Sequence, residues 1–384
     1  MEGVGVADVL QERSGKVRKG FRVFKLRRRR NLQLFFIFVK NKAAMKRVLL
    51  TGATGYIGSH VAVELVNAGY EVVGVDNFSN STPKVLDGIE RIVGRRIDFV
   101  EADCTDMEEF AKVFDLYPDI EAAIHFAAFK AVGESVAHPM KYFRNNLHSF
   151  ENLVELMVTR GKGANIVFSS SATVYGQPAL DELPIVEEQP FQEASSPYAR
   201  TKQVAEGILE DCVKAYPNLN ATVLRYFNPI GAHPSAHIGE LPNGVPNNLV
   251  PFITQTAAGI RECLSVFGND YNTPDGSCLR DYIYVVDLAK AHVKAVDKML
   301  QDGTRWNVYN LGTGRGISVL ELVNAFMKAT GVDLNYKIAP RRPGDVEQYW
   351  ADPSKANREL GWSADTPLEE VLLSAWRWQQ KISE

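Results

Sequence analysis

The chain has 384 residues, 45% of them apolar, and a formal net charge of −3, as in a globular protein with more than one compact core. Residues 1–44 hold twelve basic and three acidic residues, which leaves 31 basic and 43 acidic residues, a net charge of −12, from Met45 on. This acidic body argues against a nucleic-acid partner. Four scattered cysteines without a CxxC pair argue against disulfides or a metal site and favour a cytoplasmic protein.

Residues 1–44 form a basic N-terminal extension. The run Arg27–Arg30 precedes the apolar segment Leu34–Val39, which is far too short to span a bilayer. We therefore expect no membrane partner and an unstructured tail, with Met45 as the natural first residue. A targeting or membrane-surface arm is the alternative reading of these residues.

From Met45, short apolar runs alternate with helix-compatible sequence. Lys46–Thr51 is the first run, and Gly55–Ala68 follows it with helical periodicity. Further runs of the same kind are Glu71–Asp76, Ile97–Glu101, Ala122–Phe126, Asn165–Ser169 and Ala221–Arg225. Runs apolar on both faces predict buried parallel strands, and hence an α/β protein with a doubly wound Rossmann sheet.

After Phe227, prolines and glycines interrupt the alternation of strand-like and helix-like segments. We predict a cofactor domain over residues 45–227 and a second, smaller mixed α/β domain for the substrate over residues 228–384. Some segments of the second half should cross back to the first.

A glycine loop follows the first predicted strand. Gly52, Gly55 and Gly58 permit a tight turn, close approach of a pyrophosphate to the backbone, and packing of the next helix on the sheet. Asp76 follows at the end of the second strand, where a carboxylate binds both ribose hydroxyls and repels a 2′-phosphate. The arrangement predicts bound NAD rather than NADP.

Three further residues predict alcohol–ketone chemistry. Tyr198 and Lys202 lie four apart at the start of a predicted helix, so both project from one face. A neighbouring ammonium and the positive nicotinamide ring favour the phenolate form of tyrosine, which otherwise has a pKa near 10. Ser171, at the carboxyl end of a predicted strand, can bind the same substrate oxygen.

The GxxGxxG spacing and the YxxxK pair are typical of the extended short-chain dehydrogenase/reductases. From Lys46 onward the chain resembles their UDP-glucose 4-epimerase family, in the segments His125–Val136, Ser169–Gly176, Arg225–Pro229, Pro246–Leu249, Phe267–Tyr271 and Arg280–Tyr282. One departure is Ala128, where a glycine is often found. Residues 1–44 have no counterpart in the family.

The resemblance assigns roles to individual residues. The catalytic group is Ser171, Tyr198 and Lys202. NAD would contact Gly52, Gly55, Tyr56, Ile57, Gly58, Asp76, Asn77, Asn80, Asp103, Cys104, Phe126, Lys130, Asn145, Tyr198, Lys202 and Phe227. The UDP-hexose would contact Ser171, Thr173, Tyr198, Asn228, Asn248, Leu249, Phe267, Arg280, Arg342, Asp345 and Tyr349.

The activity implied by the resemblance is reversible epimerisation at C4 of UDP-glucose and UDP-galactose, as in galactose metabolism. It would run through a 4-keto intermediate with tightly bound NAD, in a homodimer joined by a four-helix contact. Tyr349 would limit the room at sugar C2, unless it merely packs on Trp350. The alternatives are a UDP-sugar 4,6-dehydratase or decarboxylase, and a non-catalytic NAD-sensing regulator. Dehydratases place Asp-Glu after the threonine of this strand end, where this chain has Val174 and Tyr175.

Overall fold

The computed structural model describes residues 45–342 and 346–384. The predicted N-terminal extension (residues 1–44) and the predicted substrate residue Asp345 lie outside the described residues. Within the described ranges, no helix combines the length and the apolar character that a membrane crossing requires.

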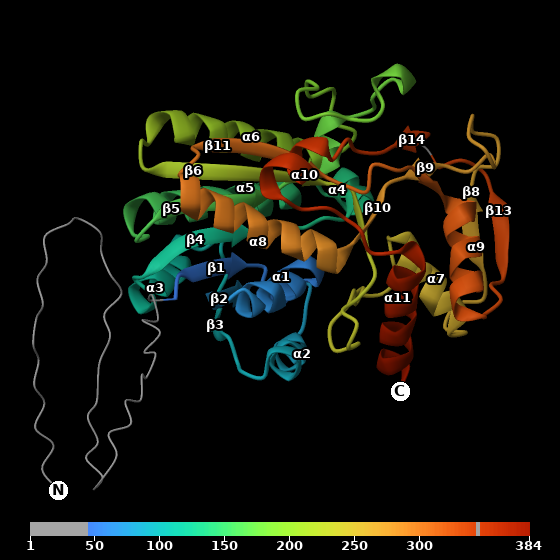
Figure 1. Ribbon diagram of the computed structural model, residues 1–384, viewed down its shortest axis with the longest axis horizontal. Coiled ribbons are helices and arrows are strands. Elements are labelled where there is room, and N and C mark those ends of the chain that lie inside the picture. The colour runs from blue at the N-terminus through green and yellow to red at the C-terminus, as the bar shows by residue number, and fades with distance from the viewer. Residues whose placement is uncertain (1–44, 343–345) are drawn as a thin grey trace, which may run out of the picture. The chain divides into compact units, whose positions relative to one another are not determined.

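A seven-stranded parallel sheet forms the centre of the fold (Figure 1). Its strand order is β11-β6-β5-β4-β1-β2-β3, with bounds β1 Arg47–Thr51, β2 Glu71–Asp76, β3 Asp98–Glu101, β4 Ile120–His125, β5 Ala164–Ser169, β6 Leu219–Tyr226 and β11 Trp306–Leu311. The six predicted strands are therefore confirmed, with ends that differ by a few residues at most. The seventh strand, β11, comes from the second half of the chain and pairs with β6.

Helices cover both faces of this sheet because alternate strand residues are apolar on both sides. The neighbours Leu49 and Leu50 of β1 belong to two separate apolar clusters, one on each face. One face carries α1 Tyr56–Asn67, α2 Lys84–Val93, α8 Val285–Asp302 and α10 Ser354–Leu360. The other carries α3 Met107–Leu116, α5 Pro139–Thr159 and α6 Pro197–Ala215. This confirms the doubly wound arrangement.

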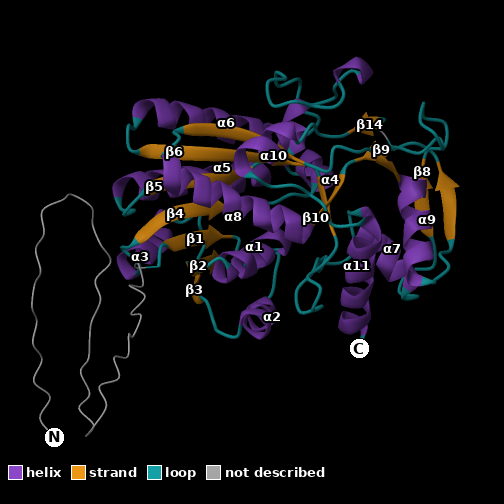
Figure 2. Ribbon diagram, in the orientation of Figure 1, coloured by secondary structure: helices purple, strands orange, loops and turns teal. Residues whose placement is uncertain are grey.

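The remaining elements form a smaller mixed region, as predicted. Figure 2 shows helices gathered beside a strand pair, away from the large sheet; these are α7 Leu249–Ala257, α9 Val319–Thr330, α11 Leu368–Ser383, β8 Leu264–Phe267 and β13 Tyr336–Ala339. Short strands connect the region to the large sheet, namely β7 Asn228–Ile230, β9 Leu279–Arg280, β10 Tyr282–Tyr284, β12 Ile317–Ser318 and β14 Gln348–Tyr349. The division at residue 227 stays a prediction.

Three short helical segments complete the description. They are α4 Val132–Ala137 and the 3-10 turns η1 Ala172–Tyr175 and η2 Leu180–Glu182. The turn η1 begins just beyond the carboxyl end of β5, where parallel sheets place their ligands. It therefore carries residues into the candidate site.

Candidate active site

The glycine loop between β1 and α1 has the shape that a dinucleotide requires. Gly52 adopts a φ of +68°, and a Cβ on it would lie 2.8 Å from the amide nitrogen of Ala127. A Cβ on Gly58 would lie 2.2 Å from the carbonyl oxygen of Gly52. The start of α1 therefore packs directly on the loop, with Gly55 at the N-cap and Tyr56 and Ile57 in the first turn. The amide groups of that first turn suit a pyrophosphate.

Asp76 lies at the end of β2, beside this loop. Its carboxylate accepts hydrogen bonds from the backbone amides of Thr54 (3.0 Å) and Phe78 (2.9 Å). These amides fix the carboxylate against the loop, which is the position that ribose recognition requires. Next to it, the Asn77 side chain donates to the Asp103 carboxylate at 3.1 Å. The loop residues and Asp76 thus fit NAD.

Other predicted cofactor residues lie on neighbouring strand ends and loops. Cys104 is buried, and burial raises the pKa of its thiol. The Phe126 ring packs on His292 with a centroid distance of 4.9 Å. Asn145 donates to the side chain of Asn146, and Asn80 accepts from Asn243 at 3.2 Å.

The catalytic group is assembled from two elements. Ser171 caps η1 after β5, whereas Tyr198 and Lys202 lie on the first turns of α6, which Ser196 caps. All three predicted catalytic side chains are buried, and the Ser171 side chain interacts with the Tyr198 hydroxyl. The structure therefore brings the three predicted catalytic residues together.

The electrostatics of this group differ from the expectation in one respect. Burial raises the pKa of Tyr198 to about 12, and the hydrogen bond with Ser171 opposes the rise. Burial of Tyr198 outweighs the lowering that was expected from Lys202, whose Nζ donates to the carbonyl oxygen of Ser169 at 2.7 Å. Burial also lowers the pKa of the Lys202 ammonium to about 8, against the attraction of Glu206. The side chains alone therefore keep Tyr198 protonated at neutral pH.

A free hydroxyl next to the catalytic group suits a substrate. Within the described residues, the buried Oγ1 of Thr173 has no hydrogen-bond partner, although its backbone amide donates to the Ser171 hydroxyl at 3.3 Å. Leaving such a group unpaired is unfavourable by about 1–3 kcal/mol. A hydroxyl of a bound sugar would satisfy it.

Tyr349 lies close to the catalytic turn. Its ring packs on Phe227 at a centroid distance of 5.2 Å, and its hydroxyl donates to the carbonyl oxygen of Ala172. Both rings belong to one buried apolar cluster with Ala172. Tyr349 is therefore more than a packing partner of Trp350, since it borders the segment that carries Ser171 and Thr173.

The residues predicted for the nucleotide lie on the smaller region. Arg280 of β9 pairs in register with Tyr349 of β14, and the guanidinium of Arg342 lies 4.0 Å from the ring centroid of Phe267. Leu249 begins α7 after Asn248, and Asn228 begins β7. Guanidinium groups beside an aromatic ring suit a diphosphate and a base.

One carboxylate missed by the sequence analysis joins the two predicted sets. Glu240 accepts from the predicted cofactor residue Lys130 (3.2 Å) and from the predicted substrate residue Asn248 (2.6 Å). Lys130 also lies 5.8 Å from the ring centroid of Tyr56. No local motif marks Glu240, because its partners are distant in sequence.

Comparisons with known proteins agree with this geometry. Residues 49–374 match the family model described as GDP-mannose 4,6 dehydratase. The UDP-glucose 4-epimerase of Bacillus subtilis is 54% identical over 332 residues, which are 86% of this chain and 96% of that protein. The chain belongs to the UDP-glucose 4-epimerase family.

Solved structures of this epimerase family share the fold. The Stenotrophomonas maltophila enzyme, with bound NAD and formylated UDP-arabinopyranose, is 46% identical with a TM-score of 0.85, over 88% of this chain and 99% of that one. The Bifidobacterium longum enzyme, in complex with NAD+ and UDP, is 46% identical with a TM-score of 0.83, over 87% and 98%. The predicted family and fold are confirmed.

A second missed residue, Asp281, organises the substrate side of this epimerase fold. Its buried carboxylate accepts from the amide and hydroxyl of Thr313 (2.8 and 2.7 Å) and from the amide of Ala351 (3.2 Å). These bonds join the residue after Arg280 to Thr313 and to Ala351, which lies two residues beyond Tyr349. The segment Arg280–Tyr282 was noted in the sequence as resembling the family, but the role of its aspartate was not predictable. Its partners, Thr313 and Ala351, are distant in sequence and come near only in the folded chain.

Proposed function

We propose that this chain is an NAD-dependent isomerase that interconverts UDP-glucose and UDP-galactose at C4 of the hexose. The observation that carries the proposal is the placement of the buried Ser171 next to the buried Tyr198, with Lys202 one helical turn from Tyr198 on α6. The curated relatives of known name support the same reaction.

In the proposed mechanism, Tyr198 removes the proton of the 4-hydroxyl and later returns it, while Ser171 holds the same oxygen. NAD, held by the glycine loop and Asp76, would supply the hydride acceptor and donor for C4 of the sugar. Because burial raises the pKa of Tyr198 to about 12, the chain relies on a positive charge brought by its ligands to favour the phenolate. Lys202 would bind a ribose hydroxyl of the cofactor.

The two regions divide the remaining work. The UDP group would be bound by Arg280, Arg342 and Asn248. The hexose could then rotate in the pocket while the nucleotide stays bound. Tyr349 and Phe227 would line the room for the hexose. All the individual site assignments belong to this proposal.

A coupled assay tests the activity directly. UDP-galactose is given to the purified protein without added NAD, and formation of UDP-glucose is followed. Conversion is expected, because NAD regenerated in each cycle stays bound. Absence of conversion, with NAD present in the protein, would reject the proposal.

The description of the matched family model keeps the dehydratase as the second candidate. A dehydratase or a decarboxylase would convert the sugar with loss of water or carbon dioxide, which mass spectrometry of the products detects. A non-catalytic NAD sensor would show neither products nor a slow NADH-like absorption band with UDP-galactose. The local sequence Ala172–Tyr175 offers no carboxylate for dehydration and favours the epimerase.

The assembly and compartment are further parts of the proposal. We place the protein in the cytoplasm as a homodimer, without a membrane or nucleic-acid partner. Exposed apolar side chains on α4 and α5, Val136 and Met140, support a protein contact there, and the four cysteines are all free thiols. Light scattering of the purified protein measures the assembly.

A further inference from the structure

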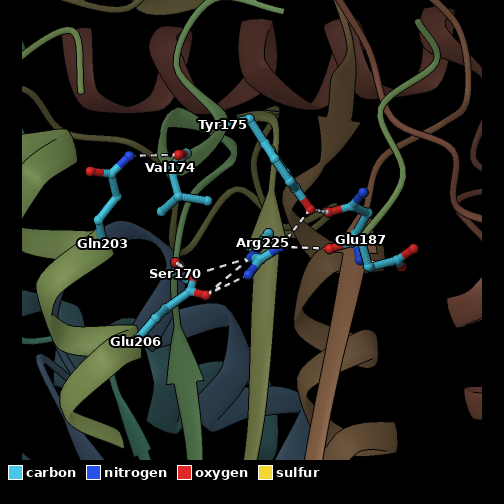
Figure 3. A network of polar contacts seen from close by, with 8 residues as sticks. Ser170, Val174, Tyr175, Glu187, Gln203, Glu206 and Arg225 are labelled. Atoms are coloured by element: carbon cyan, nitrogen blue, oxygen red, sulfur yellow. Dashed lines mark hydrogen bonds and ion pairs between the residues drawn. The ribbon is translucent and has the colours of Figure 1, made fainter. Parts of the chain in front are cut away.

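Figure 3 shows a network of polar contacts in which Glu206, Arg225 and Ser170 lie next to one another. Glu206 is on α6, one turn beyond Lys202, and Arg225 is on the neighbouring strand β6. Their side chains are 3% and 7% exposed and form an ion pair of 2.7 Å. Neither residue is among the predicted site residues.

The carboxylate of Glu206 joins the catalytic helix to the end of β5. It accepts from the hydroxyl of Ser170 at 2.5 Å and from the Nε of Arg225 at 3.1 and 3.2 Å. Ser170 directly precedes the catalytic Ser171. One end of the catalytic turn is therefore bonded to α6 through Glu206.

The guanidinium of Arg225 holds the other end of that turn. Its Nη1 donates to the hydroxyl of Tyr175 (2.9 Å) and to the carbonyl oxygen of Glu187 (3.1 Å). The Tyr175 hydroxyl in turn donates to Asn310 of β11 at 2.6 Å. From α6, the Gln203 amide donates to the carbonyl oxygen of Val174 at 2.8 Å.

Ser171 and Thr173 thus lie between two anchored ends of one short turn, and both anchors lead to the Glu206–Arg225 pair. We infer that Glu206, held by Arg225, is a positioning residue that fixes the Ser171 hydroxyl against Tyr198. Its carboxylate also places a negative charge one helical turn from Lys202, on the same face of α6. This inference rests on the proposed epimerase activity and adds residues to its machinery.

Among the groups considered around Lys202, Glu206 is the one that carries a negative charge and attracts the ammonium. Its ammonium lies 4.7 Å from the ring centroid of Phe168 and donates to Ser169 O, both from β5. His125 of β4 is buried and uncharged, since burial lowers its pKa to about 3, and Tyr198 is protonated. Arg225 of β6 carries a positive charge that is paired with Glu206. Burial lowers the pKa of Lys202 to about 8, and Glu206 opposes that fall.

The presence of a buried ion pair does not by itself indicate that the pair stabilises the fold. Replacing buried pairs by apolar side chains is often neutral or stabilising in other proteins. The pair bonds the side chains of Ser170 and Tyr175, which lie at the two ends of the turn. Their orientation gives a reason for its presence that stability alone does not.

The test compares Glu206→Gln with wild-type protein. The glutamine keeps the shape and an acceptor for Ser170 and removes the charge. We expect kcat to fall by about tenfold or more, with KM for UDP-galactose within about threefold, because the UDP contacts lie elsewhere. The alkaline limb of the kcat profile should move down by about one pH unit, since Lys202 loses its proton at lower pH. Glu206→Asp, which keeps the charge, should restore that limb.

Glu210→Gln is the matched control, because Glu210 lies one turn further along α6 and its half-exposed side chain pairs with Lys214. It should leave kcat and the pH profile unchanged. Equal pH profiles for Glu206→Gln and wild type would overturn the inference, even if the melting temperature fell. Should Glu206→Gln not fold, Ser170→Ala takes its place. A severalfold lower kcat at constant KM supports the inference, and an unchanged kcat overturns it.

A readout independent of activity separates the two proposals. The pKa of Lys202 is measured by NMR of lysine-labelled protein, assigned with Lys202→Arg. It should be lower in Glu206→Gln than in wild type, and an equal or higher value overturns the inference. If wild-type protein does not convert UDP-galactose, the epimerase proposal is rejected. If the pKa of Lys202 is nevertheless lower in Glu206→Gln than in wild type, the effect of Glu206 on the charge of Lys202 still holds.

Discussion

The catalytic turn and the nucleotide side of the molecule are built in different ways. Ser171, Tyr198 and Lys202 are buried and lie within a continuous set of hydrogen bonds from α6, β5 and β6. By contrast, β13 and the following arginines expose much of their side chains. Proton transfer depends on fixed distances, whereas a flexible, charged side chain can close on a diphosphate after it arrives. Substitutions in the two regions should therefore affect different kinetic constants.

The largest effect is expected at the catalytic turn. Tyr198→Phe removes the proton acceptor, so kcat should fall by about 10²–10⁴-fold while folding and NAD content stay intact. The coupled assay and the NAD released on denaturation measure both. Tyr216→Phe, at the exposed end of the same helix, is the control and should keep wild-type activity. A near-wild-type rate for Tyr198→Phe would contradict the mechanism.

The cofactor side of the large sheet is the next test. Asp76→Ala removes the carboxylate that Thr54 and Phe78 hold in place. Loss of its charged hydrogen bonds, worth about 1.5–3 kcal/mol, should weaken NAD retention by about ten- to a hundredfold and admit NADP. Bound nucleotide is quantified by chromatography after denaturation. Asp87→Ala, in an exposed ion pair on α2, should retain NAD. Unchanged NAD with no NADP uptake would argue against the ribose assignment.

On the nucleotide side, two adjacent arginines give a matched pair. The guanidinium of Arg341 is bonded to Asp270 at 2.7 Å, whereas that of Arg342 lies over Phe267. We expect Arg342→Gln to raise KM for UDP-galactose by about tenfold with little change in kcat, because a charged contact to the diphosphate is lost. Arg341→Gln should change KM by less than about twofold. Equal effects of the two substitutions would count against the assignment of Arg342.

The last test concerns the choice of sugar. Tyr349→Cys removes a ring that fills space next to Phe227, so it should admit N-acetylated UDP-sugars and raise their kcat/KM by about tenfold relative to UDP-glucose. Tyr336→Cys, on the exposed strand β13, should leave the preference unchanged. The idea fails if wild-type protein uses UDP-N-acetylglucosamine and UDP-glucose with similar kcat/KM.

The sequence by itself determined the parts of the site that are local. The glycine loop, Asp76 at a strand end and the Tyr198–Lys202 pair each lie within one strand, turn or helix, so their spacing fixes their relative placement. The six strands from β1 to β6 were predictable for the same reason, because continuous apolar runs mark buried parallel strands.

Only the tertiary structure decided which distant residues meet. In the sequence, Glu206 looks like a surface residue of a helix, and Arg225 follows an apolar strand without a visible partner. Segments of the second half were expected to cross back to the first, but the pairing of β11 with β6 was not predictable. The bond from Lys202 to Ser169 and the contacts of Lys130 and Asn248 with Glu240 were not predictable either. Such contacts depend on packing between elements far apart in the chain, and the residue spacing within one element carries no information about them.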